Sequence, residues 1–223
     1  MKRLAFVLAV AGCAGDTTPK WQLAYERVVA VQVSPPGILD GEVAQLSALV
    51  AHDDGPTEVV SPTGASAAFA PGGLFTAVHF KFDHWEIDGA GEEQLDQARA
   101  ELGLAAGEPV PLSVTLQFPG PLYAEKVVWL GDSRVNPPVP TVEADGVAVD
   151  DILSLASSHE TTLVIEATDG DRVRTLTSCG ELDDHDSARA RLRVEGRCEG
   201  ELAVVVRDAF GGTSWRVWPI RVQ

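Results

Sequence analysis

The alternation of apolar and polar residues predicts a chain built mainly from β-strands. The segment 27–36 (RVVAVQVSPP) reads as a strand that ends at two prolines, and 37–52 supplies the next strand after a glycine turn. Two sets of residues share a face within these strands: Val29, Val31 and Val33 in the first, and Leu46, Ala48 and Val50 in the second. Further strand-like segments of the first half lie at 76–89, 109–120 and 122–132. The pattern is that of sheets with one buried face.

One of these segments, 76–89 (TAVHFKFDHWEIDG), is out of phase with a single regular strand. If Trp85 and Ile87 point into a core, strict alternation would also bury Asp83 and Lys81. We therefore expect a bulge or break near Asp83.

Residues 91–103 (GEEQLDQARAELG) have the periodicity of a short helix. Leu95, Ala98 and Leu102 recur at helical spacing, and acidic residues occupy the first turn. Gly103 suits the C-terminal cap. This is the one helix that the pattern predicts with both ends defined.

The second half repeats the strand rhythm after a proline-rich boundary at 136–140 (NPPVP). Strand-like segments follow at 141–149, 160–169, 171–179, 188–196, 201–208 and 213–222. Val204 and Val206 point one way and Val205 the other. Trp215 and Trp218 have opposite parity, so only one of them can easily lie in a core.

These elements predict an all-β fold with two antiparallel β-sandwich domains in tandem, at 25–135 and 136–223, and a helix near 92–103 inserted in the first. The valine-rich opening strand resembles that of bacterial Ig-like and PKD-like modules, and much of 139–223 resembles the end of such a module. In Ig-like domains a tryptophan commonly packs between the sheets, and Trp85 in HWEIDG is similar. The resemblance implies no catalytic residues.

Composition supports a folded, acidic chain. The sequence carries 33 acidic and 17 basic side chains, a formal net charge of −16, and 45% hydrophobic residues. The hydrophobic fraction supplies enough apolar material for packed domains. The negative charge repels phosphate backbones, so nucleic acid is excluded as a partner.

The N-terminus has the order of regions found in secretion signals. Lys2 and Arg3 precede the apolar run 4–11, which is far shorter than the roughly 20 residues of a membrane-spanning helix. Val10-Ala11-Gly12-Cys13 resembles the lipobox of bacterial lipoprotein precursors. The resemblance implies a signal peptide at 1–12, cleaved before Cys13, and lipid on Cys13 at the start of a tether, 13–24. The alternative is an ordinary signal peptide with a chance cysteine.

The two remaining cysteines are predicted to pair with each other. Cys179 and Cys198 form an even pair in a chain with an export signal, and exported proteins retain disulfides. A free nucleophilic Cys179 is the alternative, but no neighbouring base in TSCGEL would lower its pKa.

The segment 127–133 (VVWLGDS) resembles the nucleophile block of GDSL-type hydrolases, with Ser133 as the nucleophile. That family places helices after the block and an Asp-x-x-His late in the chain. Here strands follow, and His185 has Leu182 at the acid position. Without a base the serine is an ordinary hydroxyl, so we predict a turn and no enzyme.

Acidic turns in the second half offer oxygen ligands for calcium. The candidates are Asp169, Asp171, Asp183, Asp184 and Asp186. They match no EF-hand or nonapeptide pattern, and acidic turns are usually solvated. We therefore predict no metal and no cofactor.

The histidines also lack a zinc-type spacing. His79 and His84 differ by an odd number, so an unbroken strand would direct them to opposite faces. With His52 and His159 they are interpreted as surface residues.

Together these observations predict a non-enzymatic envelope lipoprotein that acts as an interaction, adhesion or spacer module. It would contact the membrane through its lipid and a protein or polysaccharide partner in the cell envelope. In the lipoprotein sorting rules of enteric bacteria, Ala14 directly after the cysteine favours the outer membrane. The alternative is a secreted hydrolase, or an accessory subunit of an envelope enzyme, that uses Ser133.

Overall fold

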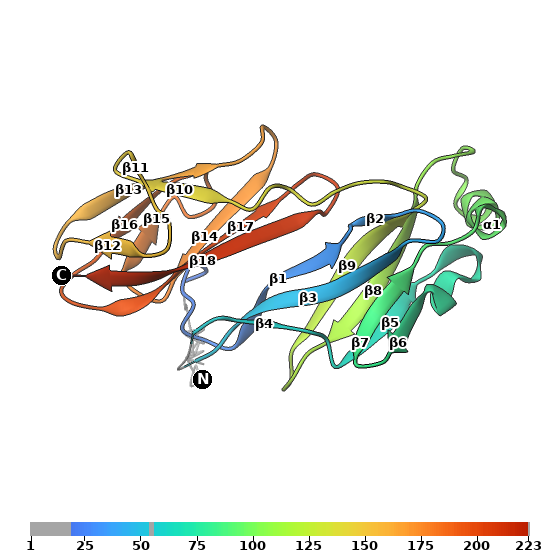
Figure 1. The fold of residues 1–223 in the computed structure, drawn as a ribbon, viewed down its shortest axis with the longest axis horizontal. Helices are drawn as coiled ribbons and strands as arrows, with labels where there is room; N and C mark the ends of the chain where they lie inside the picture. Colours follow the sequence, from blue (N-terminus) through green and yellow to red (C-terminus); the bar gives the residue numbers. More distant parts are fainter. Residues whose placement is uncertain (1–18, 54–55, 223) are drawn as a thin grey trace, which may run out of the picture.

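The computed structural model describes residues 19–53 and 56–222, and it consists of two β-sandwiches (Figure 1). Each sandwich packs two sheets against each other, which confirms the all-β prediction. Most strand pairs are antiparallel, as predicted, but the short β2 (Gly37–Ile38) and β12 (Leu153–Leu155) pair in parallel with their neighbours. Within the described residues, no helix has the length and apolar character needed to cross a bilayer.

The first sandwich contains the predicted strands of the first half. One sheet has the order β1-β3-β7-β6, with β4 paired to β3, and the other has the order β2-β9-β8-β5. The strands not yet bounded are β1 (Arg27–Ser34), β3 (Val43–Ala51), β4 (Glu58–Val60), β5 (Gly64–Phe69), β6 (Val78–Lys81), β7 (His84–Asp88), β8 (Val110–Gln117) and β9 (Tyr123–Leu130).

The core of this sandwich follows the predicted alternation except at one position. Val31 and Val33, and the predicted inner set of β3, all lie in the core. Val29 does not, because the register between β1 and β3 shifts between Val28 and Ala30. This irregularity turns Val29 to the opposite face of the sheet, where it joins a separate apolar cluster.

The predicted helix is confirmed as α1 (Glu92–Leu102). Leu95 and Ala98 are buried against the sandwich, and Gly103 ends the helix at a φ of 69°. The 3-10 segment η1 (Pro71–Ala77) packs against α1. The contact is close at Gly72, where a Cβ would lie 2.8 Å from the backbone nitrogen of Ala98.

The predicted break near Asp83 is confirmed, and it is a complete reversal of the chain. β6 and β7 form a hairpin in which Lys81 pairs with His84 across the turn residues Phe82 and Asp83. Phe82 has a φ of 57°, the left-handed conformation that tight hairpin turns use.

The second sandwich contains the predicted strands of the second half. Its sheets have the orders β11-β10-β13-β16-β15 and β12-β18-β17-β14. The bounds are β10 (Thr141–Ala144), β11 (Val147–Ala148), β13 (Glu160–Glu166), β14 (Arg172–Thr177), β15 (Glu181–Asp183), β16 (Arg189–Arg193), β17 (Glu199–Arg207) and β18 (Thr213–Val222).

The fully buried tryptophan lies in the second sandwich, not at the position expected from the Ig-like resemblance. Trp218 is 0% exposed and packs in the second core, whereas Trp85 is half-buried at the margin of the first. Trp85 lies beside the hairpin turn, where its ring meets Phe80 edge-on with centroids 5.5 Å apart. Trp215 lies on the other face of β18, as its parity predicted.

Cys179 and Cys198 form the predicted disulfide, with their Cα atoms 6.1 Å apart. Cys179 follows β14 and Cys198 precedes β17, two strands that pair in the same sheet. The bond therefore closes the end of the second core, in which Cys179 is buried.

A third apolar cluster joins the two sandwiches. Leu49 and Ala51 on the outer face of β3 pack with Leu176, Ala203 and Val205 on the outer face of the β14-β17-β18 sheet. The two sandwiches therefore share a sheet-on-sheet contact, and they are not connected only by a linker.

The predicted linker is part of this junction. Asn136 donates from Nδ2 to the Val33 carbonyl at 2.8 Å, and its Oδ1 accepts from the Thr213 backbone N–H at 2.8 Å. One side chain thus bonds both sandwiches, so the proline-rich boundary is held in place.

The predicted tether differs from expectation where the structure describes it. The signal peptide at 1–12 and Cys13 lie outside the described residues. From residue 19 onward the segment packs on the second sandwich: Leu23 donates to the Thr177 carbonyl and Thr177 to the Trp21 carbonyl, each at 2.9 Å. Leu23 is buried and Trp21 packs against the second core. Residues 19–24 are therefore part of the fold, because their apolar side chains pack against the edge of a sheet.

Candidate functional site

Titratable side chains gather on the outward face of the β6–β7 hairpin. Its register pairs Val78 with Ile87, and both side chains pack on the first core. The same register pairs His79 with Glu86 and Lys81 with His84. Directly opposite residues of an antiparallel pair point to the same face, so these four lie on the outward side.

The parity argument for His79 and His84 holds only for an unbroken strand, and the strand is not unbroken. The chain reverses at Phe82 and Asp83 and brings both histidines to one face. The signal that could have found this arrangement was the phase conflict near Asp83. A two-residue turn at that point makes His79 and Glu86 cross-strand partners.

Glu86 is the buried centre of this group, with a side chain only 9% exposed. Its Oε1 lies 2.8 Å from His84 Nε2, within hydrogen-bond distance. Its Oε2 lies 3.2 Å from Lys81 Nζ and 3.8 Å from His79 Nε2, but no hydrogen bond of good geometry reaches it. The hydrogen bond with His84, assisted by Lys81, holds the pKa of Glu86 below its ordinary value although burial opposes this.

His84 is fixed between two carboxylates. Its Nδ1 lies 2.8 Å from Asp83 Oδ1, and its Nε2 meets Glu86. The hydrogen bond with Asp83 and then the one with Glu86 raise the pKa of His84, because both favour the charged imidazolium. Its ring is consequently locked in one orientation against Glu86.

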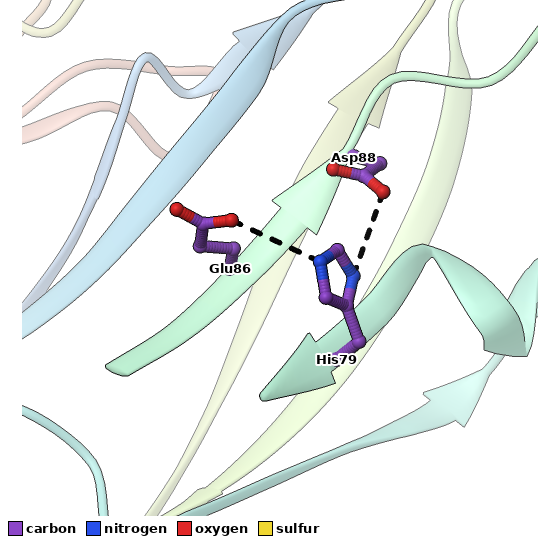
Figure 2. Close-up of side chains that lie close together, drawn as sticks. All are labelled: His79, Glu86 and Asp88. Atoms are coloured by element: carbon purple, nitrogen blue, oxygen red, sulfur yellow. Dashed lines mark ion pairs between the residues drawn. The ribbon is translucent and has the colours of Figure 1, made fainter. Parts of the chain in front are cut away.

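His79 completes the group, with a carboxylate facing each ring nitrogen (Figure 2). Nδ1 lies 3.5 Å from Asp88 Oδ2 and Nε2 lies 3.8 Å from Glu86 Oε2. One ligand atom from each of His79, Glu86 and Asp88 lies within 4.8 Å of the other two. Imidazole nitrogen and carboxylate oxygen are common ligands of divalent metals, so this arrangement has the chemistry of a small metal site.

The predicted calcium candidates do not form one ligand set. Asp169, Asp171 and Asp186 line a hollow of about 640 Å³, but three arginines, Arg172, Arg174 and Arg207, line it as well. Asp186 accepts from Arg174 Nε at 3.0 Å. Asp183 and Asp184 belong to a different place, where both lie within ion-pair distance of Arg191. Arginine thus pairs with Asp183, Asp184 and Asp186, three of the five carboxylates that calcium would need.

Ser133 lies on an exposed turn after β9. Its backbone N–H donates to Asp132 Oδ1 at 2.8 Å, and the same carboxylate pairs with Arg134. Within residues 19–53 and 56–222, no histidine contacts the Ser133 hydroxyl. His185 belongs to the second sandwich, where its carbonyl accepts from Thr175. The structure therefore does not assemble the triad that the GDSL resemblance would require.

The other two histidines lie in separate exposed pairs. His52 is 3.7 Å from Glu58, and His159 is 3.4 Å from Asp145. Each meets one carboxylate only, as expected for surface residues.

The comparisons with known proteins establish neither a family nor a function. No protein-family model matches the chain, and no curated protein matches it in sequence. Among solved structures, the chain is similar to the tandem Ig repeats of Dlar, with 10% identity, TM-score 0.33, and coverage of 90% of this chain and 98% of that one. It is also similar to the fibronectin(III)-like modules of Clostridium thermocellum CbhA, with 15% identity, TM-score 0.31, and coverage of 86% and 94%.

A third likeness is partial. A nucleoside hydrolase-related hypothetical protein from Saccharophagus degradans matches 39% of this chain at 17% identity and a TM-score of 0.30. This chain spans only 26% of that protein. Because all three TM-scores are low, no argument about function rests on these likenesses.

Proposed function

We propose that the chain is a non-enzymatic envelope lipoprotein, anchored by lipid on Cys13, whose two sandwiches act as one rigid interaction, adhesion or spacer module. The lipobox supports the anchor, and Ala14 favours the outer membrane. The observation that carries the module is the third apolar cluster, in which the outer faces of two sheets bury each other. An apolar contact of this kind restrains relative motion of the two domains, as a rigid module needs.

Polar contacts reinforce the junction beside the cluster. Lys126 of β9 donates to the Val31 carbonyl at 3.2 Å within the first sandwich. It also donates to Thr213 Oγ1 at 2.9 Å and to the Gly211 carbonyl in the second. Gln32 Nε2 donates to the Thr213 carbonyl at 2.7 Å. The directional bonds fix the angle between the sandwiches, which apolar packing alone specifies less sharply.

The first sandwich offers the contact surface for a partner. Four phenylalanines between residues 69 and 82 are exposed: Phe69, Phe75, Phe80 and Phe82. They belong to β5, η1 and the β6–β7 hairpin, which follow one another along the chain. Exposed aromatic side chains are enriched at protein contacts relative to the rest of the surface.

The anchor is tested by metabolic labelling with a fatty acid. The label should enter the wild-type chain and should not enter the Cys13→Ser variant. The variant should also be absent from the membrane fraction. Failure to label the wild-type chain would remove the lipoprotein part of the proposal and leave the module part standing.

The module is tested by affinity capture from crosslinked envelopes, using the Phe75→Ser, Phe82→Ser double variant. We expect a specific protein or polysaccharide to be retained by the wild-type chain and lost with the double variant. Val147→Ser is the matched control, because Val147 is similarly exposed at 69% but lies on the second sandwich. Equal capture by all three chains would contradict the proposed surface.

A further inference from the structure

The outward face of the β6–β7 hairpin contains a buried carboxylate oxygen that lacks a hydrogen-bond partner. Glu86 Oε2 is enclosed, and it faces the imidazole of His79. Its nearest charged neighbour is the Lys81 ammonium at 3.2 Å, but no hydrogen bond of good geometry satisfies it. A site with this feature and two further ligand residues beside it is prepared for a cation.

We propose that His79, Glu86 and Asp88 bind a divalent transition-metal ion of the Zn²⁺ type, with one imidazole nitrogen and one oxygen from each carboxylate as protein ligands. Water completes the coordination shell on the open side, since His79 is 33% and Asp88 48% exposed. Zn²⁺ accepts this mixture of nitrogen and oxygen ligands, whereas the harder Ca²⁺ prefers a set of six to eight oxygens.

The distances require only small adjustments of the side chains. Ligands at roughly 2.0–2.2 Å from one Zn²⁺ in tetrahedral geometry lie roughly 3.3–3.6 Å apart. His79 Nδ1 and Asp88 Oδ2 are already 3.5 Å apart. The three ligand atoms span at most 4.8 Å, so a rotation of the His79 ring closes the set while Glu86 stays in place.

Residues around the ligands already hold Glu86 in place. His84 Nε2 binds Glu86 Oε1 at 2.8 Å, and Asp83 in turn fixes the His84 ring. Metal-binding carboxylates are commonly oriented by such a second hydrogen bond. The chain Asp83–His84–Glu86 therefore leaves Oε2 free to face the ion.

Lys81 is the competitor for the same oxygen. Its ammonium lies 3.2 Å from Glu86 Oε2, but its side chain is 47% exposed and can move into solvent. The adjacent strand β3 brings no further charge to the site, because Val43 and Gln45 are the residues opposite Asp88 and Glu86. Removing the Lys81 charge should consequently strengthen metal binding.

Titration calorimetry with ZnCl₂ tests the site, using the full chain with its disulfide intact and no histidine tag. We expect one Zn²⁺ per chain and a higher melting temperature with the metal. His79→Ala and Asp88→Asn should each weaken binding at least tenfold, and Lys81→Met should strengthen it severalfold. His159→Ala is the matched control, because it removes a histidine that also faces an aspartate, and it should bind as the wild type does.

Several outcomes would overturn the proposal. One is that the wild-type chain gives no heat with Zn²⁺. Another is that both His79→Ala and Asp88→Asn still bind Zn²⁺ as the wild type does. The third is that Cys13→Ser abolishes binding, because the ion would then be bound by Cys13. Unchanged circular dichroism of the metal-free variants separates loss of a ligand from loss of the fold. Histidine ring signals in NMR provide a second readout: Zn²⁺ should shift those of His79 and leave those of His159 in place.

Discussion

Lys126 is a cation enclosed in the junction between the two sandwiches. Its ammonium donates to two backbone carbonyls and one hydroxyl, and within the described residues it forms no ion pair with a carboxylate. Burial, and then repulsion from Arg207, lower its pKa to about 8, which Asp208 offsets only in part. The side chain therefore helps to fix the relative orientation of the two sandwiches, but the loss of its hydration lowers the free energy of unfolding.

This cost predicts an unusual pH dependence. Between pH 8 and 10.5 the unfolded chain keeps a proton on Lys126 that the folded chain has released, so the Lys126 contribution to the free energy of unfolding rises with pH. Below pH 8 both states are charged and the penalty is fully present. Urea unfolding from pH 7 to 9.5 should show the wild type gaining about 1–2 kcal/mol relative to Lys126→Met. Parallel stability curves for the two chains would contradict the prediction.

The face on which a residue lies could be predicted from the sequence where its strand is regular, and could not where the strand is interrupted. Leu46, Ala48 and Val50 face the core because β3 keeps its register through them. Val29 was predicted on the wrong face because β1 contains an irregularity in its register with β3. The position of such an irregularity depends on how the strands pack, which a single sequence does not show. The shared face of His79 and His84 was not predicted, because parity holds only along an unbroken strand and the sequence did not show that the break near Asp83 is a two-residue turn.

At the scale of elements, the contact between η1 and α1 depends on a glycine. Gly72 has a φ of 62°, and a Cβ there would meet the backbone nitrogen, Cα and Cβ of Ala98, all within 2.9 Å. Backbone atoms within a helix cannot move aside cheaply. The close approach is therefore what places α1 over the end of the first core.

We predict that Gly72→Ala destabilises the chain by about 3 kcal/mol or more, from the left-handed backbone and the clash together. Gly107→Ala is the matched control, because Gly107 also has a positive φ, 79°, but a Cβ there meets nothing within 4 Å. That variant should lose only about 1 kcal/mol. Urea unfolding of both variants measures the difference, and equal losses would show that the contact with Ala98 is not tight.

Local signals explain why α1 was predicted with its ends and the buried tryptophan was not. Apolar spacing, acidic first-turn residues and Gly103 all belong to one short segment. The choice between Trp85 and Trp218 instead depends on where each strand lies in its sheet. Trp85 adjoins the turn of an edge hairpin, whereas Trp218 lies on β18 between two neighbouring strands.

At the scale of the whole molecule, the junction makes one body of two sandwiches. The sequence predicted two domains and a stiff segment at 136–140, but not their contact. A signal was present: β3 ends in ALVA and β17 contains LAVVV, which are apolar at consecutive positions. A strand that is apolar on both faces is typically buried on both faces. The sequence does not show which two strands contact each other across the junction, because other strands are also largely apolar.

The third apolar cluster predicts how the molecule responds to a charge placed at its centre. Val205 is 0% exposed and lies on the face of β17 that meets the first sandwich. Val205→Asp would bury a carboxylate without a partner, so we expect the sandwiches to separate while each keeps its own core. Small-angle X-ray scattering should then show a larger radius of gyration and a broader distribution of distances.

Val164→Asp is the matched control for this change, since Val164 also lies on a strand but is 39% exposed. It should leave the scattering curve unchanged. None of the buried residues of the two cores belongs to the third apolar cluster, so the Val205→Asp chain should retain its β-sheet circular dichroism. An unchanged scattering curve for Val205→Asp would mean that the polar contacts of Lys126, Gln32 and Asn136 hold the junction alone. Complete unfolding would mean that neither sandwich is stable without the other, and rigidity would then be a condition of folding as well as of function.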